Sequence, residues 1–98
     1  MSGEPKLFSE VALKDLIEIV SFIANKDPQA AIKVKEEIIS RANILSEHPE
    51  IGRLGRVQGT RELVLTGISH IHIYRVVNER PQIIRVLHDR QNWLSAPT

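Results

Sequence analysis

Arginine and histidine side chains gather in the second half of the sequence, and their types are suited to chemistry on a phosphate. Cleavage of RNA through its own 2′-hydroxyl needs a base near that hydroxyl, cations around the phosphate and an acid for the leaving oxygen. Histidine and arginine can supply all three without a metal ion. The candidate catalytic set of such a metal-independent endoribonuclease is Arg75, Arg85, His88 and Arg90.

A second interpretation assigns the arginines to binding. The planar guanidinium fork suits carboxylates, phosphates and guanine edges, and Arg85 and His88 differ by an odd number of positions, which separates them on a regular strand. The same arginines could instead pair with Glu and Asp of their own fold. The candidate partner-binding arginines are Arg53, Arg56, Arg61 and Arg90.

Three histidines of this region, His70, His72 and His88, raise the possibility of a metal site. His70 and His72 are two residues apart and would point to the same side of a strand. The sequence contains no cysteine, and no aspartate joins the histidines at ligand spacing. We therefore expect no metal and no cofactor.

The elements that must position these residues lie between Gly59 and Arg90. Short runs rich in Val, Ile, Leu and Thr are separated by turn residues, which is typical of consecutive hairpin-linked strands. The three expected strands are Arg61–Thr66, His70–Val77 and Gln82–His88. Alternation groups Ile71 with Ile73 on the middle strand, and Ile83, Arg85 and Leu87 opposite Ile84, Val86 and His88 on the last.

Both faces of this sheet are apolar in the sequence, so one face is free for a partner if helices cover the other. Ile71 and Ile73 are therefore candidate partner-binding residues. Trp93 has two interpretations, as a cap on the edge of the core or as an anchor for a partner.

Two helices are expected before the sheet. Ser9 is suited to be the N-cap of the first, whose apolar residues recur at helical spacing to about Asn25. Asp27-Pro28 begins the second, and His48-Pro49 ends it. Because few residues separate the two, they should form an antiparallel helical hairpin that covers the sheet.

Two short segments flank the helical hairpin. Lys6-Leu7-Phe8 could add an edge strand, and Glu50–Gly59, with its glycines and no periodicity, is expected to be a loop. The expected fold is α+β: an N-terminal edge strand, then an antiparallel helical hairpin packed on a three-stranded antiparallel sheet.

Composition limits the class of protein. A chain of 98 residues, 42% hydrophobic and 26% charged, forms one domain; we expect residues 1–5 and 91–98 to be flexible or ordered by a partner. The absence of cysteine and of a signal-like N-terminus favours the cytoplasm. No apolar run approaches the length of a membrane span, so we expect no membrane contact.

Three segments of the sequence read H-P-E-I-G-R-L-G-R-V-Q-G-T-R-E-L-V-L, then H-I-H-I-Y-R-V, then I-I-R-V-L-H-D-R-Q-N-W. Together they closely resemble the ParE/RelE toxins of bacterial type II toxin–antitoxin modules. The resemblance covers almost the whole chain. It implies a toxin of the plasmid-stabilisation type, neutralised by a cognate antitoxin that wraps it, with operator DNA bound only through the antitoxin.

The family has two branches, and the residues at which this sequence differs from RelE-like toxins indicate which branch it resembles. RelE-like members cut messenger RNA on the ribosome, whereas ParE-like members inhibit DNA gyrase. Where RelE-like toxins place two lysines and a central arginine, this sequence has Glu62, Val64 and Ile71; no tyrosine follows Tyr74, and only Arg90 falls near one of their catalytic arginines. Losing those cations removes transition-state stabilisation.

The resemblance therefore favours a gyrase inhibitor without a catalytic site. The alternative is the RelE-like ribonuclease; another ribonuclease arrangement of the family, with a glutamate, an arginine and a C-terminal histidine, is imitated only loosely by Glu50 or Glu62 with Arg75 and His88. A third interpretation is a non-toxic member that only binds its antitoxin.

Overall fold

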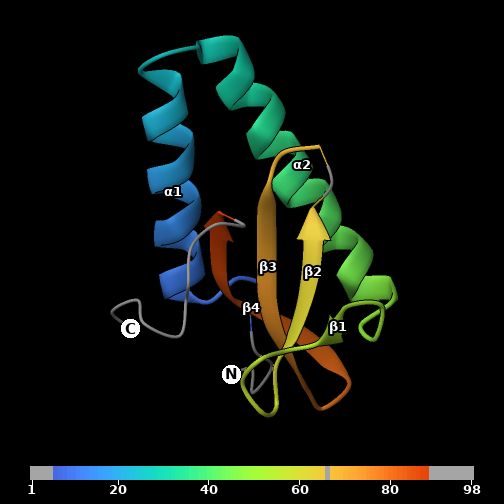
Figure 1. Ribbon diagram of the computed structural model, residues 1–98. Helices are drawn as coiled ribbons and strands as arrows, with labels where there is room; N and C mark the ends of the chain where they lie inside the picture. Colours follow the sequence, from blue (N-terminus) through green and yellow to red (C-terminus); the bar gives the residue numbers. More distant parts are fainter. Residues whose placement is uncertain (1–5, 66, 89–98) are drawn as a thin grey trace.

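The structure is a computed structural model that describes residues 6–65 and 67–88. Two helices precede a four-stranded antiparallel sheet in the order β1-β2-β3-β4. Figure 1 shows the two helices as a hairpin beside the sheet. The elements are α1 (Glu10–Ala24), α2 (Pro28–Glu47), β1 (Arg53–Leu54), β2 (Arg61–Leu65), β3 (His70–Val77) and β4 (Arg80–His88). The α+β fold class is confirmed.

Both helices begin at the residues that the sequence predicts. The Ser9 hydroxyl accepts a hydrogen bond from the backbone N–H of Ala12 at 3.1 Å, and the Asp27 carboxylate accepts one from Ala30 at the same distance. Each satisfies an amide that the first turn leaves unpaired. Pro28 follows Asp27 at the first helical position, where its missing N–H costs nothing.

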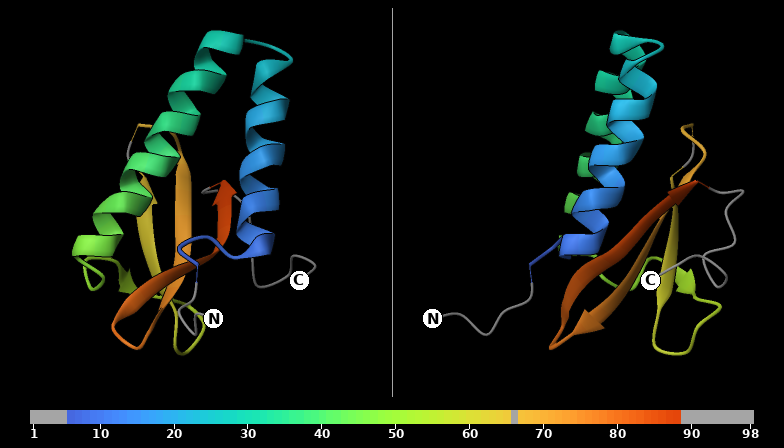
Figure 2. Two further views of the ribbon diagram at one scale, coloured as in Figure 1. Left: turned by 180° about the vertical axis from the view of Figure 1, so that it is seen from behind. Right: turned by 90° about the vertical axis from the view of Figure 1, so that its left-hand side faces the viewer.

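The core lies between the helical hairpin and one face of the sheet, as the two-layer arrangement in Figure 2 shows. The helices and the strands each supply buried apolar side chains to it, and this packing stabilises the two layers together. The buried residues of this cluster are Ala12, Leu16, Ile38, Ala42, Leu45, Leu65, Tyr74, Ile83 and Val86.

A bulge in β4 corrects the predicted strand faces. Ile73 pairs with Arg85 but Tyr74 pairs with Ile83, so Ile84 is an extra residue in the ladder. Ile83 and Val86 consequently lie together in the helix-side core, while Leu87 and Ile84 pack with Ile71 and Ile73 in a second cluster. Simple alternation, which placed Ile83 with Leu87, was wrong here.

The N-terminal segment covers the outer edge of β4. Phe8 forms an isolated parallel bridge with Ile83, where the N–H of Ile83 donates to Leu7 and its carbonyl accepts from Ser9. The edge strand expected at Lys6–Phe8 is therefore a single bridge. At the opposite edge, Arg53 and Leu54 form a two-residue strand within a segment predicted to be a loop.

Neither of the helices in the described part of the chain is long and apolar enough to cross a membrane.

Candidate functional site

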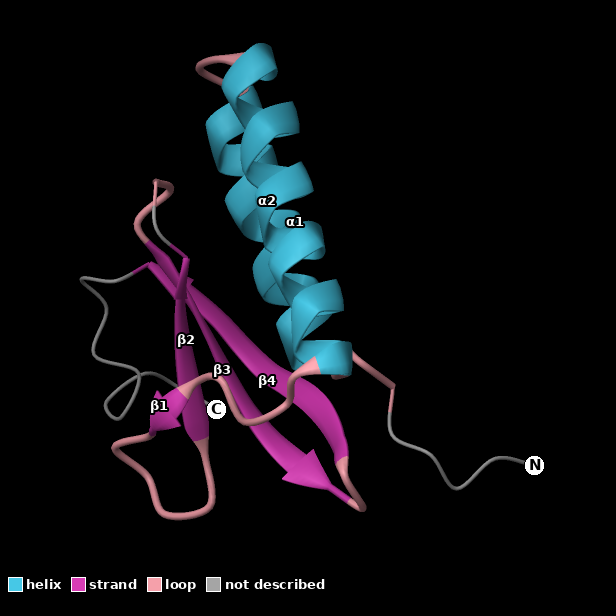
Figure 3. Ribbon diagram, turned by 90° about the vertical axis from the view of Figure 1, so that its right-hand side faces the viewer, coloured by secondary structure: helices cyan, strands magenta, loops and turns pink. Residues whose placement is uncertain are grey.

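We call the face of the sheet opposite the helices the outer face. Figure 3 shows that both helices lie on the other side of the sheet. Strand register places Glu62 beside Ile73 and Val64 beside Ile71 on this face, and Arg75 follows two residues along β3. Ile71 and Ile73 are only 5% and 1% exposed, whereas Val64 is 40% exposed. Among the described residues of this face, Val64 and Arg75 are therefore accessible, whereas Ile71 and Ile73 are not.

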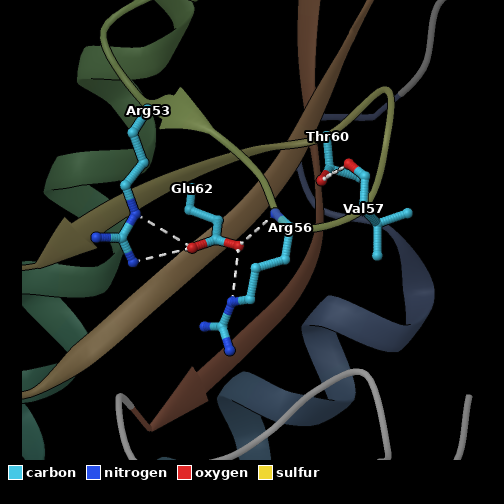
Figure 4. A network of polar contacts seen from close by, with 5 residues as sticks. All are labelled: Arg53, Arg56, Val57, Thr60 and Glu62. Atoms are coloured by element: carbon cyan, nitrogen blue, oxygen red, sulfur yellow. Dashed lines mark hydrogen bonds and ion pairs between the residues drawn. The ribbon is translucent and has the colours of Figure 1, made fainter.

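Glu62 is the centre of a polar network on this face, shown in Figure 4. One carboxylate oxygen accepts hydrogen bonds from Nε and a terminal nitrogen of Arg53 at 3.2 and 2.9 Å. The other accepts from the backbone N–H and Nε of Arg56 at 3.1 and 3.4 Å. The glutamate is 2% exposed, while the side chains of Arg53 and Arg56 are 58% and 42% exposed. A buried carboxylate thus holds two arginines whose outer surfaces meet solvent.

Opposing effects set the charge of Glu62. Burial is the largest and raises the pKa of its carboxyl, but the backbone hydrogen bond from Arg56, the side-chain bond from Arg53 and the charges of both arginines lower it. The net pKa lies below the ordinary value of 4.5. Glu62 is consequently ionised at neutral pH.

The loop between β1 and β2 is also closed by bonds that do not involve Glu62. The N–H of Gly55 donates to the carbonyl of Thr60 at 2.8 Å, and the Thr60 hydroxyl donates to the carbonyl of Val57 at 2.6 Å. A Cβ on Gly55 would lie 2.9 Å from the Thr60 carbonyl oxygen. A side chain at residue 55 would therefore clash with the backbone of Thr60 on the other side of the loop.

Arg61 points to the other side of β2 from Glu62. Its guanidinium donates to the backbone carbonyls of Gly52 at 2.8 Å and Glu50 at 3.3 Å. The Tyr74 hydroxyl donates to Pro49 at 2.7 Å and accepts from the N–H of Gly52 at 2.9 Å. Arg61 and Tyr74 therefore fasten the segment between α2 and β1, and Arg61 is not part of the cluster around Glu62.

The candidate catalytic residues that the structure describes are separated. Arg85 binds the Asp15 carboxylate of α1 at 2.8 Å, whereas Arg75 is exposed and donates to Gln82 at 3.2 Å. His88 pairs with His70, five residues before Arg75 on β3, which corresponds to roughly 16 Å along a strand. Arg75 and His88 thus lie near opposite ends of the same ladder.

The three histidines do not share one environment. His70 and His88 stand edge to face with ring centroids 5.4 Å apart, on the helix side of the sheet. His72 is fully buried and bound to a backbone carbonyl of α2. Within residues 6–65 and 67–88, no three His, Cys, Asp or Glu side chains are placed to hold a metal ion.

Two predicted residues lie outside the described part of the chain, and two residues that bind the arginines were not predicted. Arg90 and Trp93, predicted to contact a partner, lie outside the described residues. The carboxylate partners of the arginines are not predictable from spacing along the chain; they are Glu62 for Arg53 and Arg56, and Asp15 for Arg85. The usable signal for Glu62 was its position as an acidic residue within an apolar strand, since a buried charge requires a partner.

Known proteins are similar to this chain over most of its length. Residues 7–93 match the model of the family described as the ParE toxin of the type II toxin–antitoxin system parDE. The candidate toxin Y4kP of Sinorhizobium fredii is 42% identical over 82 residues, which span 84% of each protein. Toxin RelE3 of Caulobacter vibrioides is 33% identical over 79 residues, covering 79% of this chain and 85% of that protein.

A solved structure extends the comparison to the fold. A chain of the chromosomal ParDE toxin–antitoxin system from P. aeruginosa superimposes with a TM-score of 0.75 and 25% sequence identity. The match covers 83% of this chain and 90% of that one.

Proposed function

The chain belongs to the ParE toxin family of type II toxin–antitoxin systems, and on this premise we propose that it binds DNA gyrase and inhibits it. Membership of this family implies a cognate antitoxin as a partner. The proposal adds the target, and it assigns target binding to the outer face, where Arg53, Arg56 and Arg75 reach solvent.

The observation that carries the proposal is that arginines on or near the sheet are bound to carboxylates of the fold, and that the described candidate catalytic residues do not gather around one site. Arg53 and Arg56 share the carboxylate of Glu62, and Arg85 binds Asp15. Cleaving a phosphodiester requires cations and an acid–base group converging on one phosphate. Arg75 and His88, near opposite ends of the ladder, do not converge in this way. A surface that recognises a protein needs no such convergence.

A ribosome-dependent ribonuclease is the second candidate function. The observation in its favour is that one relative, 33% identical, is named toxin RelE3. The two functions predict different products in purified systems, cleaved DNA with gyrase or a cleaved transcript with ribosomes. The same preparation of protein can therefore test both.

The test uses the full chain released from its antitoxin. Added to gyrase and relaxed plasmid, it should block supercoiling and accumulate cleaved DNA; added to ribosomes programmed with a transcript, it should leave the transcript intact. Cleavage of the transcript on the ribosome, with gyrase unaffected, would establish the ribonuclease and overturn the proposal.

Substitution of the exposed Arg75 tests the assignment to the outer face. Arg75→Glu reverses a charge on this face, and we expect inhibition of gyrase to fall about tenfold or more, as for loss of a charged interface contact. Lys33→Glu makes the same charge change on the exposed side of α2 and should leave inhibition unchanged. Equal effects of the two variants would show that net charge, and not the outer face, is responsible.

A further inference from the structure

Glu62 divides its carboxylate between two arginines that are otherwise open to solvent. Each oxygen serves one guanidinium, and both side chains leave terminal N–H groups facing outwards (Figure 4). Arg75 adds a further cation to the same face, two residues from the strand partner of Glu62. The cluster of Arg53, Arg56 and Glu62 therefore carries one net positive charge instead of two.

The loop does not depend on Glu62 alone for its closure. Gly55 and Thr60 already join its two sides through the backbone, and the Thr60 hydroxyl closes the turn onto Val57. Burying a carboxylate costs free energy that only its partners offset. Besides holding the loop, the buried carboxylate of Glu62 therefore changes the electrostatic potential around Arg53 and Arg56.

The negative charge of Glu62 limits which anions can bind to the arginines. A phosphate bound to the outward N–H groups of Arg53 or Arg56 would lie well within a Debye length, about 8 to 10 Å, of the Glu62 carboxylate. Repulsion between the two anions opposes such binding, and it acts on every phosphate of a polyanion that comes within this range. Neutral acceptors, such as peptide carbonyls, experience no such repulsion and can still accept hydrogen bonds from the same groups.

We propose that Glu62 is a specificity-determining residue of the outer face, which keeps Arg53 and Arg56 from binding nucleic-acid phosphates and reserves them for a protein partner. The inference deepens the proposed function and rests on it only in taking the outer face as the surface that meets the target. It names the class of partner that this surface rejects, single-stranded RNA and other phosphate chains.

The test replaces the charge and keeps the shape. In Glu62→Gln, affinity for a fluorescein-labelled single-stranded oligouridylate, measured by anisotropy at low salt, should rise about tenfold, and the slope of log K against log salt should steepen by ~0.7 for each new phosphate contact. A change in slope reports phosphate contacts, which fastening the loop alone would not alter. Unchanged affinity and slope in the folded variant would overturn the proposal.

Matched controls separate position from net charge. Glu37→Gln also removes one carboxylate paired with an arginine, Arg41 on α2 at 3.3 Å, but away from the outer face; it should leave oligouridylate binding unchanged. The triple variant Glu62→Gln, Arg53→Gln, Arg56→Gln should return to the wild-type affinity. A gain in Glu37→Gln, or a gain that survives in the triple variant, would also contradict the proposal.

A second variant keeps the test decisive if Glu62→Gln fails to fold. Val64 is 40% exposed on the same face, two residues from Glu62 on β2, so Val64→Lys adds a third cation beside a carboxylate that already serves two, at a surface position where substitutions usually change stability little. It should produce oligouridylate binding with a steeper salt dependence, and the absence of any gain would overturn the proposal. If gyrase is unaffected by the wild-type chain while these binding results hold, the proposed target fails and the role of Glu62 stands.

Discussion

The imidazole of His72 joins the sheet to the second helix, with its Nε2 2.9 Å from the carbonyl oxygen of Ile38. The ring is fully buried and stands edge-on to Phe8, with the ring centroids 6.0 Å apart. Nε2 must carry the proton that this bond needs, and Nδ1 has no hydrogen-bond partner among the described residues. The ring is therefore neutral, and burial lowers the pKa of His72 to about 4.

We expect the protein to lose stability as the pH falls from 6.5 towards 4. In this window the unfolded chain protonates His72, with an ordinary pKa of 6.5, whereas the native state does not. The unfolding free energy should fall by about 1.4 kcal/mol per pH unit, up to roughly 3 kcal/mol. Urea denaturation across this range measures it.

Two variants assign that pH dependence to one histidine. His72→Gln keeps a side-chain N–H able to reach Ile38 and should flatten the dependence, whereas His48→Gln, at the exposed end of α2, should not. An unchanged slope in His72→Gln would mean that other groups are responsible.

Removing the Tyr74 hydroxyl should destabilise the fold by about 1–3 kcal/mol. Tyr74→Phe leaves the buried N–H of Gly52 and the carbonyl of Pro49 without their partner. Equilibrium unfolding in urea measures the loss. A change below about 0.5 kcal/mol, the range of an ordinary surface substitution, would indicate that both backbone groups find other partners.

Asp15→Ala should cost about 3–5 kcal/mol, because it removes a carboxylate that binds both a partly buried arginine and a buried backbone N–H. Asp15 accepts two bonds from Arg85, at 2.8 and 3.2 Å, and one from the backbone N–H of Val86 at 2.9 Å. A double-mutant cycle with Arg85→Ala measures the coupling, and the double variant should lose less than the sum of the two single losses. Strict additivity would contradict the pairing.

Adjacent isoleucines on α2 should respond differently to truncation. Ile38 is fully buried in the helix-side core, whereas Ile39 is 37% exposed. Ile38→Ala should therefore cost about 2–5 kcal/mol in unfolding free energy, and Ile39→Ala less than about 1 kcal/mol. Thermal unfolding of the two variants compares them directly, and equal losses would contradict the described helix orientation.

Local signals made the helices and most of the sheet predictable. Ser9 and Asp27-Pro28 start the helices because capping depends on a few neighbouring residues. Arg53–Leu54 was missed as a strand because two residues have no periodicity to detect. The bulge at Ile84 was missed because it depends on pairing with β3, which alternation along β4 does not report.

The candidate site was predicted as a set of residues but not as an arrangement. Arginine-rich composition indicates Arg53 and Arg56, and it leaves open whether arginines pair with carboxylates of the same fold. Which carboxylate each would meet depends on contacts between distant residues, 70 positions apart for Asp15 and Arg85. Spacing along the chain carries no information about such contacts.

The two edges of the sheet differ in how they can associate with other chains. Leu7, Ser9 and Asp15 take up backbone groups of β4, while in the described residues β2 continues to Leu65 beyond its two paired positions with β1. Among the described residues, β2 therefore extends beyond its pairing with β1, whereas the β4 edge is occupied at Ile83 and Val86. A second copy that paired its own β2 there would make one continuous sheet across a two-fold axis, and the contacts already made at Ile83 and Val86 would oppose further growth from β4.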